Sequence, residues 1–228
     1  MNYRTLTSIA LLLCMATTSF SKPGFKIGIS GGYCLDKIKE KNYSDREKRM
    51  SAFDVAIPME IKISDYFAIQ PEVHFIQKGF GIDMYGIGGV ETQYKRRIYA
   101  EVPILFKGIF DFKEKSSINF YTGIGVGVAI TNKIVQKNTD GSKTKENYPY
   151  DNNVDDDNQA YKRYDIVIPI GFGYEYRIAD RLSFFTDIRY NMDVNNNIRY
   201  KVKPSPTPKY KYRNFILSVG FNFIAKER

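Results

Sequence analysis

Charged side chains recur at every second position in several segments that are otherwise rich in large apolar residues. Acidic and basic groups placed in this way could pair with one another inside a closed space, or they could line a path for ions through it. The residues that show this placement are Asp54, Glu60, Lys62, Glu72, Glu101, Lys107, Glu175, Asp187 and Arg189. A mixture of acids and bases is what pairing requires, so these residues predict an interior polar network.

Two acidic segments could bind a metal ion, but neither has a complete ligand set. Asp193 to Asn197 has the first spacings of a calcium loop, yet Ile198 stands where that loop needs glycine and Pro204 where it needs an acid. The acidic run in residues 151–157 has the composition of a solvated loop. We therefore expect solvated loops at both places, and neither a metal nor a cofactor.

Catalysis has little support in the sequence. The chain has one histidine, His74, two residues after Glu72 on the polar side of its segment. A lipase or acyltransferase would need a serine and a histidine that meet at one surface, and no such set can be proposed. We expect that the protein is not an enzyme, with a lipid-modifying enzyme as an alternative.

The segments that carry these charges have the period of β-strands. Residues 215–223 place five large apolar side chains on one face and small or polar ones on the other. Eight such segments follow one another, and the polar face carries too many charges and glycines for the dry core of a soluble lipocalin-like barrel. The pattern predicts an all-β, eight-stranded, antiparallel, up-and-down transmembrane barrel.

The lengths of the connections predict how this barrel is oriented. Short connections alternate with long ones, and the long ones are Leu35–Met50, Phe80–Gln93, Asn132–Lys162 and Asp193–Lys211. Outer-membrane barrels have short periplasmic turns and long extracellular loops. Both ends of the chain are therefore expected in the periplasm of a Gram-negative bacterium.

The first 21 residues have the features of a signal peptide. Arg4 precedes an apolar run, and Ser19 and Ser21 provide the small residues of a cleavage site. Cys14 follows three leucines, which do not suit a lipoprotein site, so we expect it to be removed with the signal. The prediction is a signal peptide over residues 1–21 and one barrel domain over residues 22–228, with Cys34 as its single cysteine.

Two motifs resemble those of a known family. Tyr99-Ala100-Glu101-Val102-Pro103-Ile104-Leu105-Phe106-Lys107 and Gly171-Phe172-Gly173-Tyr174-Glu175-Tyr176 are similar to segments of the outer-membrane β-barrel proteins labelled porin-family or PorT-like, which are common in Bacteroidetes-type bacteria. The resemblance covers essentially everything after the signal. It implies an eight-stranded outer-membrane barrel and says little about biochemical role.

The interior of so small a barrel has room only for its own side chains, which predicts a filled lumen rather than a pore. A small porin-like channel remains the alternative. The chain has a net charge of +9, and bases gather in residues 37–49 and 201–213, the latter around Pro204, Pro206 and Pro208. We expect a structural or interaction protein whose partners are outer-membrane lipid, including lipopolysaccharide phosphates at these basic loops, or a protein of an envelope machine. Nucleic acid is not expected as a partner.

Overall fold

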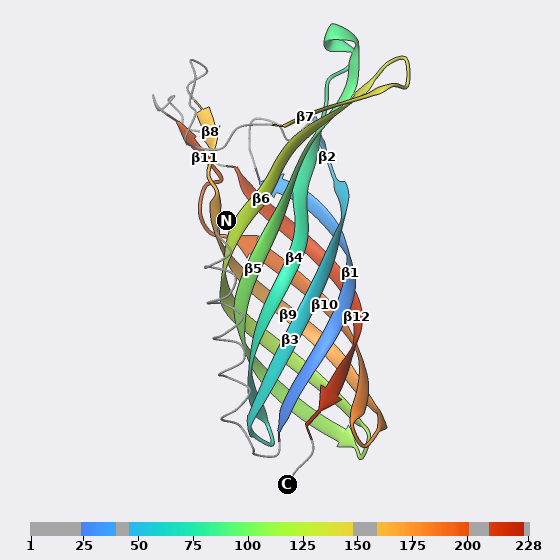
Figure 1. The fold of residues 1–228 in the computed structure, drawn as a ribbon, viewed down its shortest axis with the longest axis vertical. Coiled ribbons are helices and arrows are strands. Elements are labelled where there is room, and N and C mark those ends of the chain that lie inside the picture. Colours follow the sequence, from blue (N-terminus) through green and yellow to red (C-terminus); the bar gives the residue numbers. More distant parts are fainter. Residues whose placement is uncertain (1–23, 40–45, 148–158, 201–209, 226–228) are drawn as a thin grey trace, which may run out of the picture.

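The computed structural model describes residues 24–39, 46–147, 159–200 and 210–225. These residues form a tall, closed β-barrel with strands that tilt around its axis (Figure 1). The barrel strands are β1 (Phe25–Lys39), β3 (Met50–Ser64), β4 (Phe67–Asp83), β5 (Val90–Lys113), β6 (Ser116–Asn138), β9 (Tyr164–Ala179), β10 (Leu182–Asp193) and β12 (Lys211–Ile224). Shorter elements are β2 (Glu47–Lys48), β7 (Lys143–Asn147), β8 (Gln159–Tyr161), β11 (Ile198–Tyr200) and the 3-10 turn η2 (Ile87–Gly89).

Each barrel strand pairs in antiparallel fashion with its neighbours along the chain. The ring runs β1-β3-β4-β5-β6-β9-β10-β12 and closes where β12 pairs with β1, from Lys26 opposite Ile224 to Lys39 opposite Lys211. The predicted eight-stranded antiparallel barrel is therefore confirmed. Strands β4 and β10 are four positions apart in this ring, which places them on opposite sides of the lumen.

The alternation in the sequence corresponds to an inside-out barrel. In β12 the side chains of Phe215, Leu217, Val219, Phe221 and Phe223 are exposed, whereas Ser218 and Asn222 are each only 6% exposed. The apolar face therefore points away from the lumen and the polar face points into it. No helix among the described residues is long and apolar enough to cross a membrane.

The predicted bounds of three long loops were wrong, because the strands continue into them, whereas the bounds Asp193–Lys211 agree with the end of β10 and the start of β12. β4 extends to Asp83 and β5 begins at Val90, so only residues 84–89 connect them. β6 extends to Asn138 and turns back into β7. Together these strands form a twisted ribbon that projects beyond the barrel at the end where the predicted extracellular loops lie (Figure 1). The predicted signal peptide, residues 1–21, lies outside the described residues.

Prolines interrupt the hydrogen-bonded ladders inside the barrel wall. Pairing between β1 and β3 stops at Ile27 opposite Met59 and resumes at Ser30 opposite Ala56, on either side of Pro58. The β6 and β9 ladder has a similar gap beside Pro169. Proline has no N–H to donate, so the ladder loses a bond at each of these positions while the ring remains closed.

Candidate functional site

The lumen contains three groups of polar side chains, which we call the lower, middle and upper clusters, counting from the end with the short turns, which is predicted to be periplasmic. In the lower cluster Lys26 Nζ lies 3.1 Å from Glu60 and 2.8 Å from Glu175. Lys107 Nζ lies 2.6 Å from the other oxygen of Glu60 and donates to Gln70 at 3.0 Å. The two lysines therefore share Glu60, and the paired charges of this cluster balance.

Gln70 connects the lower cluster to the middle one. Its Nε2 donates to Glu72 at 2.7 Å. Arg189 Nη1 donates to Glu72 at 2.6 Å, and Nη2 donates to the second carboxylate oxygen at 3.1 Å. A two-bond pair of this kind fixes both side chains in one geometry. Because Arg189 is on β10 and Glu72 on β4, the pair crosses the full diameter of the barrel.

His74 lies beside this crossing and is only 4% exposed. Its Nδ1 is 2.8 Å from Asp54, and its Nε2 is 2.6 Å from Glu72. Both ring nitrogens therefore contact carboxylates inside the lumen, and the ring is remote from the lipid-facing surface. A lipid-modifying enzyme that used this histidine would have to act at that surface, so the geometry does not favour it.

Tyr121 completes the middle cluster from β6. Its hydroxyl donates to Asp187, and Arg189 Nε donates to the tyrosine oxygen at 3.1 Å. The guanidinium also lies over the tyrosine ring, 5.1 Å from its centroid. The ring occupies the space above Gly171 on the neighbouring strand, where any added Cβ would overlap it.

The upper cluster surrounds Lys78, which is completely buried. Its Nζ lies 2.6 Å from Glu101, 3.0 Å from Asp165 and 2.9 Å from Asp193. Asn197 donates to the second oxygen of Asp193 at 2.8 Å. The expectation of a solvated loop at Asp193 to Asn197 was wrong, because both of these residues are 1% exposed and close over the lumen.

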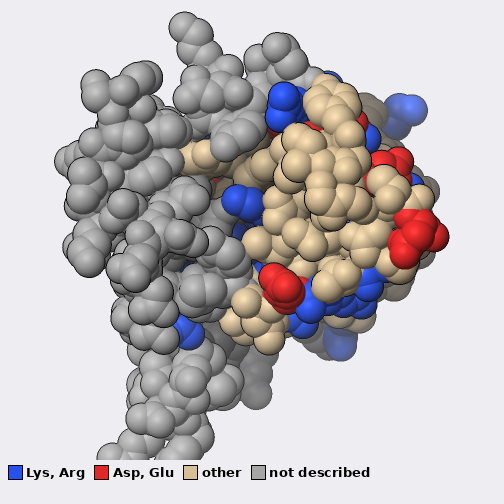
Figure 2. Space-filling model, turned by 90° about the horizontal axis from the view of Figure 1, so that it is seen from above, with Lys and Arg blue, Asp and Glu red and all other residues tan. Residues whose placement is uncertain are grey.

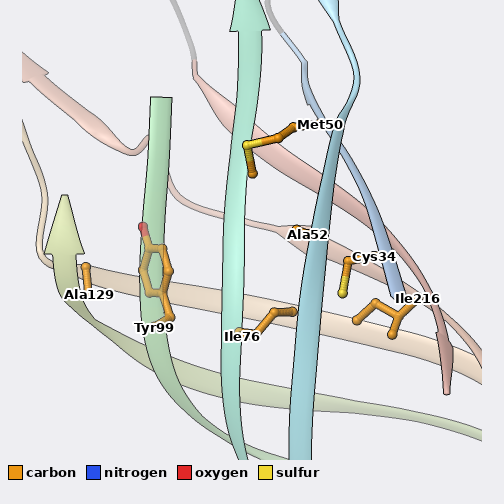
Figure 3. Close-up of a cluster of buried hydrophobic side chains, with 7 residues drawn as sticks. All are labelled: Cys34, Met50, Ala52, Ile76, Tyr99, Ala129 and Ile216. Atoms are coloured by element: carbon orange, nitrogen blue, oxygen red, sulfur yellow. The ribbon is translucent and has the colours of Figure 1, made fainter. Parts of the chain in front are cut away.

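An apolar layer lies between the middle and upper clusters. It consists of Cys34, Met50, Ala52, Ile76, Tyr99, Ala129 and Ile216, from six strands of the wall (Figure 3). On β4 it lies between His74 and Lys78, since Ile76 is the inward residue between them. Its side chains fill space that would otherwise admit water.

The space left in the lumen is unequal along its length. The middle cluster leaves about 20 Å³, room for about one water molecule. At the end with the short turns a cavity of about 560 Å³ opens below the lower cluster. We call it the vestibule; its inner limit includes Lys26, Glu60 and Lys107.

The sequence-predicted residues occupy these clusters with one exception. Glu60, Lys107 and Glu175 are in the lower cluster; Asp54, Glu72, Asp187 and Arg189 are in the middle one; Glu101 is in the upper one. Lys62 lies instead at the rim beside the turn between β3 and β4, with a side chain that is 29% exposed and 3.7 Å from Asp65.

Sequence reasoning did not include four central residues, namely Lys26, Lys78, Asp165 and Asp193. The first three obey the same alternation as the predicted residues and could have been selected on that ground. Asp193 has a weaker signal, because it ends its strand.

The basic loops are described only in part. Lys37 is exposed, whereas Lys48 lies 2.9 Å from Asp83 and Arg46 lies over the Tyr85 ring. Arg213 donates to the backbone oxygen of Asp193 at 2.8 Å. Residues 40–45 and 201–209, with the three prolines, lie outside the described residues. From above, the described residues show an uncharged region with basic and acidic residues at its margin (Figure 2).

A closed antiparallel barrel with an apolar exterior and a charged lumen defines the class of outer-membrane β-barrel proteins. The family model described as "Outer membrane protein beta-barrel domain" matches residues 15–199, and the chain belongs to this family. This family and the fold support a location in the bacterial outer membrane. None of the curated proteins matches the sequence.

Solved structures with a similar fold are also outer-membrane barrels. Ail of Yersinia pestis, solved in complex with the heparin analogue sucrose octasulfate, is 16% identical with a TM-score of 0.43 over 89% of this chain and 100% of that one. Neisserial surface protein A is 15% identical with a TM-score of 0.43, over 89% and 99% of the two chains. OprG of Pseudomonas aeruginosa is 10% identical with a TM-score of 0.48, over 90% and 97%.

Proposed function

We propose that this protein is a sealed outer-membrane barrel whose role is interaction at its extracellular end. The observation that carries the proposal is that two charged pairs cross the full diameter, Arg189 with Glu72 and Lys78 with Asp193. Separating either pair would take buried charges away from their partners on the opposite wall, which is unfavourable in a lumen that water does not fill. A lumen closed at two heights has no aqueous path, so the extracellular surface is where the protein can act on other molecules.

The chemistry of that surface favours anionic partners. The basic loops, residues 37–49 and 201–213, would attract the phosphates of lipopolysaccharide or an acidic protein of an envelope machine. The motifs Tyr99–Lys107 and Gly171–Tyr176 further support membership of the PorT-like type found in Bacteroidetes. Export would depend on residues 1–21 as a cleaved signal peptide.

Conductance in planar bilayers tests the sealed lumen. The full protein, purified from outer membranes, is expected to insert without discrete current steps. The double variant Lys78→Ser with Arg189→Ser removes both crossings and is expected to conduct, provided that it still migrates faster unboiled than boiled on a gel. Discrete currents from the wild-type protein would contradict the proposal.

Such currents would favour the alternative, a small porin-like channel. The observation on its side is the vestibule of about 560 Å³, which already opens the periplasmic end. Conduction would then require Lys26, Glu60 and Lys107 to separate at its inner limit.

Binding to immobilised lipopolysaccharide tests the interaction role. Affinity is expected to fall as salt rises, because exposed charges are screened. The loop variant Lys37→Gln with Lys209→Gln and Lys211→Gln is expected to bind more weakly. Salt-independent binding would count against an electrostatic role for these loops.

A further inference from the structure

The projecting ribbon has two chemically different faces. Directly opposed residues of antiparallel strands point to the same side. Arg96 of β5 is opposite Lys133 of β6, which is opposite Asn147 of β7. The next rows on this side are Tyr94 with Val135 and Lys145, then Thr92 with Lys137 and Lys143. We call these nine residues the basic face.

Positive charge is concentrated on the basic face. It carries one arginine and four lysines and no acidic residue. Asp83 of β4, opposite Thr92 at the edge of the face, is paired with Lys48 at 2.9 Å. Lys133, Lys143 and Lys145 are exposed and form no ion pair with the residues that the structure describes. Lys137 alone is neutralised, by Glu91 at 2.5 Å. The opposite side of the same rows holds one base and one acid, Lys95 and Glu146.

The basic face continues the lipid-facing surface of the barrel. Arg96 lies two residues before the outward residue Ile98, about 7 Å along the strand. Ile130, 47% exposed, lies in the β6 wall three residues before Lys133. Arg96 and Lys133 are therefore next to the apolar belt, the outward apolar surface of the barrel wall, at the level of lipid headgroups. The other cations lie farther from the belt, in rows about 7 Å apart. Val135 lies between the rows of charge, and Tyr94 beside it packs against the apolar layer with Arg96 over its ring.

We propose that the basic face binds the phosphorylated sugar headgroup of a glycolipid in the surrounding outer leaflet. Its cations would bind the phosphates, and the apolar belt below would contact the acyl chains of the same molecule. Continuity with the lipid-facing wall is what favours a membrane glycolipid over a soluble polyanion, which would gain nothing from the belt. This inference rests on the proposed interaction role and adds a site that lies outside the two basic loops.

Native mass spectrometry of the full protein in a neutral detergent tests the site by counting the glycolipid molecules that each barrel retains. The probes are diphosphoryl lipid A and monophosphoryl lipid A, with a heparin oligosaccharide as soluble competitor. The face variant is Lys133→Gln with Lys143→Gln and Lys145→Gln. The matched control removes the same charge at the periplasmic end, with Lys113→Gln, Lys115→Gln and Arg177→Gln. Heat-modifiable migration on a gel verifies that each variant forms a barrel.

The wild-type protein is expected to retain diphosphoryl lipid A more tightly than the monophosphoryl form. The face variant is expected to bind lipid A at least about tenfold more weakly, because each of the three lysines it removes should contribute severalfold to binding at an anionic surface. The periplasmic control should bind as the wild type does. Equal binding by the face variant would overturn the proposal.

Two further outcomes would overturn the site and leave the interaction role intact. One is loss of lipid A binding in the loop variant together with full binding in the face variant. The other is displacement of lipid A by the heparin oligosaccharide at equal charge concentration, which would make the occupant a soluble polyanion. A third outcome would show that the acidic run in residues 151–157 of this chain, and not a glycolipid, occupies the face. Asp155→Asn with Asp156→Asn and Asp157→Asn would then raise lipid A binding from an undetectable level, which would contradict the proposal.

Discussion

Tyr121 of β6 lies across Gly171 of β9, in the space that any larger side chain at residue 171 would need. The glycine allows the ring to lie flat on the wall, where its hydroxyl reaches Asp187 and its face reaches the guanidinium of Arg189. One missing side chain on the wall therefore positions three polar groups in the lumen.

Gly171→Ala is expected to displace Tyr121 and weaken the middle cluster. Overpacking of this kind costs about 1–3 kcal/mol of folding free energy. A urea titration followed by gel migration without boiling measures the loss. Gly31→Ala is the matched control, because an added Cβ there meets nothing within 4 Å. Equal stability of the two variants would contradict the role of Gly171.

Lys78→Met is expected to destabilise the barrel by about 3–5 kcal/mol, because three carboxylates would remain buried without their cation. The urea titration followed by gel migration measures this loss of stability, with Lys133→Met as a control at an exposed lysine. Adding Asp193→Asn to Lys78→Met should recover part of the loss, since it removes one of the uncompensated charges. A double variant that is less stable than Lys78→Met would exclude this explanation.

Cys34 is 0% exposed and is the single cysteine after the predicted signal peptide. We expect the folded barrel to resist a bulky maleimide for hours and to react fully after boiling in detergent. A shift in gel mobility on addition of the reagent records the reaction. Rapid labelling without boiling would show that water reaches the apolar layer, and would argue against a sealed lumen.

The pairing of Lys48 with Asp83 predicts how β2 responds to pH. A hydrogen bond from Lys48 lowers the pKa of Asp83. The carboxylate therefore stabilises the docked strand at neutral pH. This stabilisation is complete above the ordinary carboxyl pKa of about 3.9, decreases as the pH falls below that value, and is gone once the pH has passed the lowered pKa of Asp83.

Amide exchange in residues 46–49 tests this dependence. Protection of these amides should fall in strong acid in the wild type. In Asp83→Asn it should be weak throughout, with no acid transition of its own. An acid transition that Asp83→Asn retains would assign the titration to another group.

The strand faces could be predicted because the wall imposes a period of two wherever lipid is on one side and polar lumen on the other. The signal disappears where the lipid ends, which is why the expected loops at residues 80–93 and 132–162 began too early. Beyond the lipid, polar and apolar residues occur on both faces of a strand, as at Lys133 to Asn138, where Ile134 and Val135 point to opposite sides. The alternation then carries no apolar contrast.

Partners in the lumen could not be predicted from the same pattern. Arg189 and Glu72 are 117 residues apart and meet because β10 and β4 lie opposite each other in the ring. That relation depends on strand number, tilt and register together, none of which one segment contains. Asp193 shows the same limit, since its burial depends on Lys78 from the opposite wall.

The pairing of β1 with β12 also fixes the order in which this barrel can assemble. The seam joins the first and last strands, with Lys26 opposite Ile224, so its contacts are among the most distant in the chain. Long-range contacts of this kind make folding slow, because the intervening chain must be ordered before they form. Until β12 arrives, β1 and β10 each present an unpaired edge that can capture another chain. Closure must therefore be the final event, and a chaperone that shields these two edges during transit would protect the protein at its most vulnerable stage.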